Sequence, residues 1–172
     1  MAPCTYGKTV VVYSFPGKGL VAMLQDTPIL LAESDPHDVA LLRHAFAKAG
    51  IHHPLVVVDN GKDAIDYLGR QGIYSDAEKY PWPCLILLDL NMPVVDGMEV
   101  LAWRRTQQHL SEIPIIVLTG SVSDSEVQKV LDLGATDWRH KPHEFDDLIV
   151  LCQEIRFRWL SSSSPVIAHR SP

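Results

Sequence analysis

Short apolar runs alternate along the chain with longer segments in which apolar residues recur every three or four positions. Apolar runs without internal polar alternation are typical of strands that are buried on both faces of a sheet. Four such runs and a fifth, less apolar run predict five strands. These predicted strands are Ile29–Ala32, Leu55–Val58, 84–88, 115–118 and about 136–140.

The intervening segments carry helical spacing together with signals for where helices begin. Pro36 fits the first position of a helix, with Ser34 or Asp35 as its cap. Ser123, three residues before a glutamate, indicates a capping box at the start of a fourth helix. The last of five predicted helices runs from about residue 143 to residue 160.

Strands that alternate with helices predict an α/β fold, with a parallel sheet between two layers of helices. Right-handed crossovers would place the C-terminal end of every strand on one edge of that sheet, where such folds bind ligands. Polar residues follow four of the predicted strands, namely Glu33 with Ser34 and Asp35, then Asp89, Thr119 and Lys141. Acids, a hydroxyl and an amine on one edge would suit a carboxylate that accepts a phosphoryl group beside a divalent cation.

Composition narrows the classes of partner. The net charge of −6 over 172 residues argues against general nucleic-acid binding, and no apolar stretch is long enough to span a bilayer. Cys4, Cys84 and Cys152 lack the spacing of metal ligands. Because Cys84 and Cys152 fall in apolar runs, we expect reduced, buried thiols and a cytoplasmic protein.

The two ends of the chain differ from its middle. Residues 1–27 contain one short β-prone run and no helical period, so a disordered extension is the favoured interpretation and an extra edge strand is the alternative. Met23 offers a second candidate start of translation. The serine-rich residues 161–172 predict a disordered tail. One domain is therefore expected over residues 28–160.

That region resembles the receiver domain of two-component response regulators. Five stretches carry the resemblance in order, namely residues 29–33, residues 87–93, Asp96-Gly97, residues 117–120 and Lys141-Pro142. The connection with Gly72, Tyr74, Asp76 and Ala77, and the ending at residues 157–160, are similar to a narrower group. That group comprises small stand-alone regulators, some of which are paired with phytochrome-type histidine kinases.

The resemblance implies a flavodoxin-like, CheY-like fold with a five-stranded sheet of order 2-1-3-4-5 and five helices. It also implies a reaction, in which Asp89 accepts a phosphoryl group from the phosphohistidine of a sensor histidine kinase. Mg²⁺ would be the cofactor. Such a chain is a phosphorylated signalling protein and not an enzyme, apart from its own phosphorylation and autodephosphorylation.

Individual positions take their expected roles from the same resemblance. Glu33 matches the first acidic position of the metal site, and Asn91 the position whose backbone carbonyl binds the metal. Thr119 and Lys141 match the hydroxyl and the amine that hold the phosphoryl oxygens. Trp138 matches an aromatic residue that changes rotamer on activation, although an aromatic side chain in an edge strand often only packs. The Lys141-Pro142 bond is expected to be cis.

Ser34 departs from the family pattern, which has a second acid at this position. Mg²⁺ uses one or two carboxylates and completes its shell with water. Glu33 and Asp89 meet that minimum, with a water bridged by Ser34. The sequence therefore predicts weaker Mg²⁺ binding, and a site that does not bind Mg²⁺ is the alternative.

Three functions follow from these residues. In the first, a phosphorylated receiver without an output domain signals by protein contact to a downstream target, and residues 155–160 offer a homodimer seam. In the second, the chain is a pseudo-receiver that binds partners without phosphorylation because of Ser34. In the third, the chain is an aspartate-based phosphatase. Asn91 disfavours this last function, because an amide cannot act as the general acid.

Arg104 and Arg105 are expected on a solvated helix face.

Overall fold

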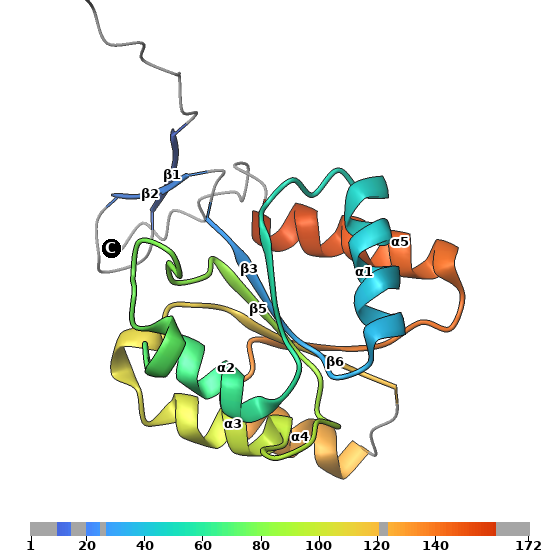
Figure 1. Cartoon of the computed structure of the whole chain (residues 1–172). Coiled ribbons are helices and arrows are strands. Elements are labelled where there is room, and N and C mark those ends of the chain that lie inside the picture. The colour runs from blue at the N-terminus through green and yellow to red at the C-terminus, as the bar shows by residue number, and fades with distance from the viewer. Residues whose placement is uncertain (1–9, 15–19, 25–26, 121–123, 161–172) are drawn as a thin grey trace, which may run out of the picture.

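The computed structural model describes residues 10–14, 20–24, 27–120 and 124–160. Five parallel strands form one sheet in the order β4-β3-β5-β6-β7 (Figure 1). Numbered from the first strand of this sheet, that order is 2-1-3-4-5, which confirms the predicted topology. The strands are β3 (Ile29–Ala32), β4 (Leu55–Val58), β5 (Leu85–Leu88), β6 (Ile115–Thr119) and β7 (Asp137–His140).

Helices cover both faces of the sheet, and each face has its own apolar core (Figure 1). On one face lie α1 (Pro36–Lys48) and α5 (Phe145–Ile155). The other face carries α2 (Gly61–Leu68), α3 (Gly97–Arg105) and α4 (Asp124–Asp132). The central strands are buried from both sides, which explains why their sequences are uniformly apolar.

Local signals in the sequence fix where two of these helices begin. Asp35 caps α1 by accepting a hydrogen bond from the His37 N–H at 2.8 Å, and Pro36 occupies the first helical position. Asp96 and Glu99 form a capping box at the start of α3. The capping box predicted at Ser123 lies outside the described residues.

The last helix is shorter than the sequence predicted. Glu144 has extended backbone angles, so α5 begins at Phe145, two residues later than expected. After Ile155 the chain continues as a wider π-helical turn, η3 (Arg156–Leu160). The Arg156 guanidinium donates to the carbonyl of Ala49 at 3.2 Å, which ties this turn to the end of α1.

Arg104 corrects the expectation of a solvated helix face. Only 8% of this residue is exposed, because it reaches under the loops that precede β6 and β7. Its guanidinium donates to four backbone carbonyls, those of Leu110, Ser111, Ile113 and Gly134, at 2.7–3.2 Å. Arg105 beside it is exposed, as expected, and donates to the carbonyl of Asp132.

Two short strands precede the domain, β1 (Val10–Ser14) and β2 (Leu20–Leu24). They pair antiparallel with each other in a sheet of their own, and neither joins the five-stranded sheet. The remaining residues of 1–27, apart from Thr27, and all of 161–172 lie outside the described part of the chain, so the expected domain boundaries stay predictions. No helix among the described residues has the length and apolar character needed to cross a membrane.

Candidate functional site

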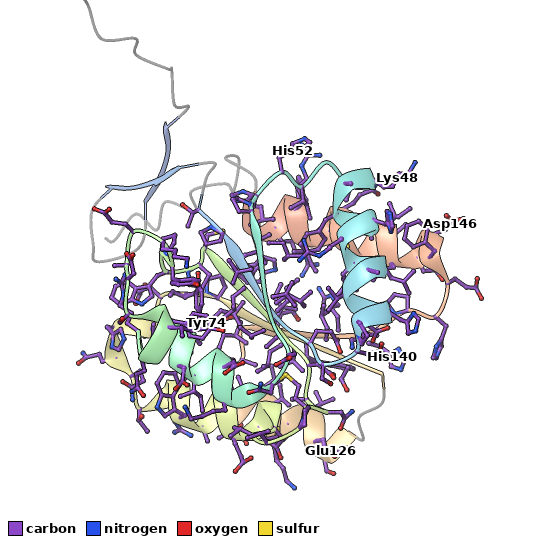
Figure 2. The ribbon with its side chains drawn as sticks, in the orientation of Figure 1. Lys48, His52, Tyr74, Glu126, His140 and Asp146 are labelled. Carbon is purple, nitrogen blue, oxygen red and sulfur yellow. The ribbon has the colours of Figure 1, made fainter. Side chains whose placement is uncertain are left out.

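Three of the residues predicted to form the site come together at the C-terminal edge of the sheet. Glu33 follows β3, Asp89 follows β5 and Lys141 follows β7. Figure 2 labels His140, the residue before Lys141, near the start of α1. Glu33 is 2% exposed and Asp89 is 6% exposed, so both carboxyl groups are largely removed from water.

The Lys141 amine links these acids and a further one. It forms ion pairs with Glu33 and with Asp38, the latter at 2.8 Å between Nζ and Oδ2. Its distance to Oδ1 of Asp89 is 3.8 Å, which is too long for a hydrogen bond. Asp38 lies in the first turn of α1 and was not predicted from the sequence as a site residue.

These contacts and burial shift the pKa values of Glu33 and Lys141. Burial raises the pKa of the Glu33 carboxyl, although hydrogen bonds from the Lys141 amine and from the Asp35 N–H oppose that rise. Burial would lower the pKa of the Lys141 amine, but hydrogen bonds to Asp38 and Glu33 outweigh it, and the pKa is raised. At neutral pH Lys141 is therefore a cation.

The backbone holds Asp89 firmly. Its own N–H donates to the carbonyl of Ala32 at 2.9 Å, which joins it to the neighbouring strand. The Leu90 N–H donates to Oδ1 of Asp89, also at 2.9 Å. Among the described residues no donor forms a hydrogen bond with Oδ2, the other carboxylate oxygen.

Thr119 and Trp138 lie on the opposite side of the strand ends from Lys141. Thr119 is fully buried, and its carbonyl accepts a hydrogen bond from the Lys141 N–H at 2.8 Å. Trp138 pairs with Val117 across β6 and β7, so its side chain shares a face with Val117 and Thr119. The Trp138 ring is half-buried and packs against the core beneath α2, α3 and α4.

Ser34 lies beside the carbonyl that the resemblance assigns to the metal. Its hydroxyl donates to the carbonyl oxygen of Asn91 across 3.4 Å, a long and weak contact. Asp35 faces the other way and caps α1. It is therefore Ser34, and not Asp35, that occupies the position of the missing acid.

The oxygen donors at this edge fit Mg²⁺. No three His, Cys, Asp or Glu side chains among the described residues converge as a metal site. Mg²⁺ needs only one or two carboxylates, and it completes its octahedral shell with carbonyl oxygens and water. The carboxylates of Glu33 and Asp89 with the carbonyl of Asn91 are such a set, since all three are hard oxygen donors.

The expected cis bond between Lys141 and Pro142 is not found. No peptide bond among the described residues is cis. The trans form of a bond before proline is favoured by about 0.5–1 kcal/mol unless the surroundings impose the other form. The resemblance alone was therefore a poor guide to this bond.

The loop after Asp89 contains a strained residue. Val94 has a φ of 69° and is 82% exposed, and the Val95 N–H donates to the carbonyl of Pro93 across it at 2.8 Å. A β-branched residue in this left-handed region is a genuine outlier.

We expect Val94→Asn to raise the free energy of unfolding by about 1 kcal/mol, because asparagine tolerates this conformation better. Urea denaturation measures the change. Ile73→Asn, at a 74% exposed position with a negative φ, is the matched control and should change stability by less than about 0.5 kcal/mol. Equal effects of the two substitutions would show that Val94 is not strained.

Comparison with known proteins bears on this geometry. A family model described as the response regulator receiver domain matches residues 29–153. The chain belongs to this receiver family. Members of the family are the regulators of two-component signalling, which confirms the resemblance and the fold expected from it.

Receivers linked to phytochromes are among its similar relatives. Response regulator Rcp1 of Synechocystis sp. is 36% identical over 134 residues, which cover 78% of this chain and 89% of Rcp1. The crystal structure of the phosphorylated cyanobacterial phytochrome response regulator RcpA matches with a TM-score of 0.74 and 33% identity, over 81% of this chain and 97% of RcpA. The Mn²⁺-bound form of Rcp1 matches with a TM-score of 0.71 and 35% identity, over 80% and 97% of the two chains.

Proposed function

We propose that this receiver accepts a phosphoryl group on Asp89 from the phosphohistidine of a histidine kinase, with Mg²⁺ as cofactor. One observation carries the proposal most directly. A buried carboxylate at the C-terminal edge of the sheet lies 3.8 Å from an ammonium group that is also bound to a second buried carboxylate, Glu33. The proposal is supported by this arrangement, because phosphoryl transfer needs an acceptor carboxylate, a cation and an acid that can hold a metal close together.

The chemistry requires little more than position and charge. Oδ2 of Asp89 attacks phosphorus, the new P–O bond forms, and the P–N bond to the kinase imidazole breaks, with its electron pair leaving on that nitrogen. Mg²⁺ would neutralise charge between the attacking carboxylate and the incoming phosphoryl group, and would be held by Glu33, Asp89 and the carbonyl of Asn91. Lys141 then follows the phosphoryl oxygens on its flexible side chain.

Thr119 and Trp138 would pass the change on to the surface. A hydrogen bond from the Thr119 hydroxyl to a phosphoryl oxygen draws Thr119 toward Asp89. The space that this opens lies on the face shared with Trp138, whose ring then turns inward. Such a local charge event coupled to a packing change is how phosphorylation switches act.

The partners follow from the relatives. RcpA is a phytochrome response regulator by its description, and this supports a phytochrome-type sensor kinase as the phosphoryl donor here. We expect the output to be contact with a downstream protein. Phe157 in η3 is 70% exposed and supports a homodimer seam at this residue, whereas Ile155 is 2% exposed and Trp159 and Leu160 pack against the core of the same domain.

Phosphorylation with a small phosphodonor tests this function. Incubation with acetyl phosphate and Mg²⁺ should add the mass of one phosphoryl group to the intact protein. The adduct should be lost with a chelator and in the Asp89→Asn variant. An unchanged mass at every Mg²⁺ concentration would instead favour the phosphorylation-independent binding module, the second candidate that Ser34 supports.

The effect on Mg²⁺ affinity of a serine in place of the acid at position 34 can be measured separately. We expect Ser34→Asp to tighten Mg²⁺ binding about tenfold, or about 1.4 kcal/mol, because it adds a carboxylate beside the carbonyl of Asn91. Calorimetric titration of Mg²⁺ measures the affinity. Ser75→Asp, which adds the same charge at an exposed position after η1 (Gly72–Tyr74), is the control. Equal affinities for the two variants would show that position 34 does not contact the metal site.

A further inference from the structure

We propose that Asp38 is a positioning residue, which holds the Lys141 amine on the α1 side of the site and so keeps the Asp89 carboxylate available. The inference rests on the proposed function, because it concerns how Asp89 meets Mg²⁺ and the phosphoryl group. The sequence motifs do not point to Asp38. It emerges only from its contact with Lys141.

Three carboxylates surround one ammonium group, and they share it unequally. The Lys141 amine has three N–H donors. Two of the acids, Glu33 and Asp38, accept hydrogen bonds from it, whereas Oδ1 of Asp89 lies 3.8 Å away. Without Asp38 the amine would keep Glu33 and turn its released N–H toward Asp89, the next nearest acid.

Such a shift matters more in this chain than in a receiver with a second acid at position 34. With Ser34 there, the proposed metal site has two carboxylates among the described residues, those of Glu33 and Asp89. One ammonium group that paired closely with both would offset half of their negative charge and so weaken their attraction for the metal. Asp38 prevents this by drawing the cation toward α1.

Asp38 can hold the amine in this position because hydrogen bonds of Asp35 define the first turn of α1. Asp35 caps α1, and the carbonyl of Asp35 accepts a hydrogen bond from the Val39 N–H at 3.0 Å, so the first helical turn is well defined. The Asp35 N–H also donates to Oε1 of Glu33 at 2.9 Å. One short segment therefore orients both Glu33 and Asp38, the two acids that hold Lys141.

The Asp38→Asn variant tests the proposal, since it keeps the shape and removes the charge. The Mg²⁺ concentration at half-maximal binding, measured by calorimetry, should rise about tenfold. The rate of phosphorylation by acetyl phosphate should fall at low Mg²⁺ and return to within about twofold of wild type when Mg²⁺ saturates. Asp38→Glu, which keeps the charge, should recover most of the affinity.

Asp63 provides the matched control, because it occupies the same position in the first turn of α2 that Asp38 occupies in α1. Its carboxylate interacts with Asn60 and not with Lys141. Asp63→Asn should leave the Mg²⁺ affinity within about twofold of wild type. An equal loss in both variants would mean that any nearby acid serves, and the proposal would be wrong.

The same substitution in a protein that lacks the Lys141 amine shows whether Asp38 acts through Lys141. In a Lys141→Ala protein, adding Asp38→Asn should change Mg²⁺ affinity by less than about twofold, because there is no amine left to position. A tenfold loss that persists without Lys141 would overturn the proposal.

If wild type takes up no phosphoryl group, the proposed function fails. If wild type is labelled and Asp38→Asn shows unchanged Mg²⁺ dependence, only the role of Asp38 fails.

Discussion

Gly97→Ala is expected to lower the free energy of unfolding by about 3 kcal/mol, at the upper end of the cost of overpacking a well-packed site. A Cβ at position 97 would lie 2.3 Å from the carbonyl oxygen of Asp89 and 2.8 Å from the Cα of Leu90. Both are backbone atoms, which cannot rotate away as the end of a side chain can. The Gly97 N–H also donates to the carbonyl of Leu90 at 3.0 Å, so the contact cannot open without losing that bond.

The same substitution should displace Asp89 and slow its phosphorylation. Urea denaturation gives the stability, and intact mass after treatment with acetyl phosphate gives the labelling. Gly120→Ala is the control for stability, because among the described residues other than its chain neighbours no atom lies within 4 Å of a Cβ built at Gly120. If Gly97→Ala were as stable as Gly120→Ala, the close approach of α3 to the loop after β5 would be wrong.

Arg104→Met should also cost about 3 kcal/mol, because it leaves buried carbonyl oxygens without the charged donor that satisfies them. Four carbonyls depend on this guanidinium, those of Leu110, Ser111, Ile113 and Gly134. They belong to the connections before β6 and before β7. Arg104→Lys should recover only part of the loss, since one ammonium group cannot reproduce the spread of a guanidinium.

Arg105→Met is the matched control for Arg104→Met. Arg105 is exposed and donates to one carbonyl, that of Asp132, at 3.1 Å. Arg105→Met should therefore change the free energy of unfolding by less than about 0.5 kcal/mol. Equal midpoints of urea unfolding for the two methionine variants would show that Arg104 does not hold the two connections together.

The central strands β3, β5 and β6 could be predicted from sequence because each is buried on both faces and leaves a continuous apolar run. Ile29–Ala32 and Leu55–Val58 were predicted to the residue. β7 has the least apolar sequence of the five, and it begins one residue later than predicted. The predicted order followed from resemblance to a family, and the alternation of strands and helices alone gave only a parallel sheet.

The site was predictable where residues directly follow strands, since the topology alone brings strand ends together. Glu33, Asp89 and Lys141 were found in this way. Asp38 was missed because it does not directly follow a strand and lies in the first turn of α1, where an acid usually interacts with the helix dipole. Arg104 was misjudged because two adjacent arginines in a helix look the same in the sequence whether both are solvated or one reaches under a loop.

The chemical identity of the phosphorylated residue is the most direct test of the account. After treatment with acetyl phosphate and Mg²⁺, reduction with borohydride converts an aspartyl phosphate to homoserine, which peptide mass spectrometry locates. We expect homoserine at position 89 and at no other acid, and its loss when Mg²⁺ is chelated. Homoserine at another position, such as 38, or unmodified Asp89 in protein that carries the phosphoryl group, would contradict the assignment of Asp89 as the phosphoacceptor.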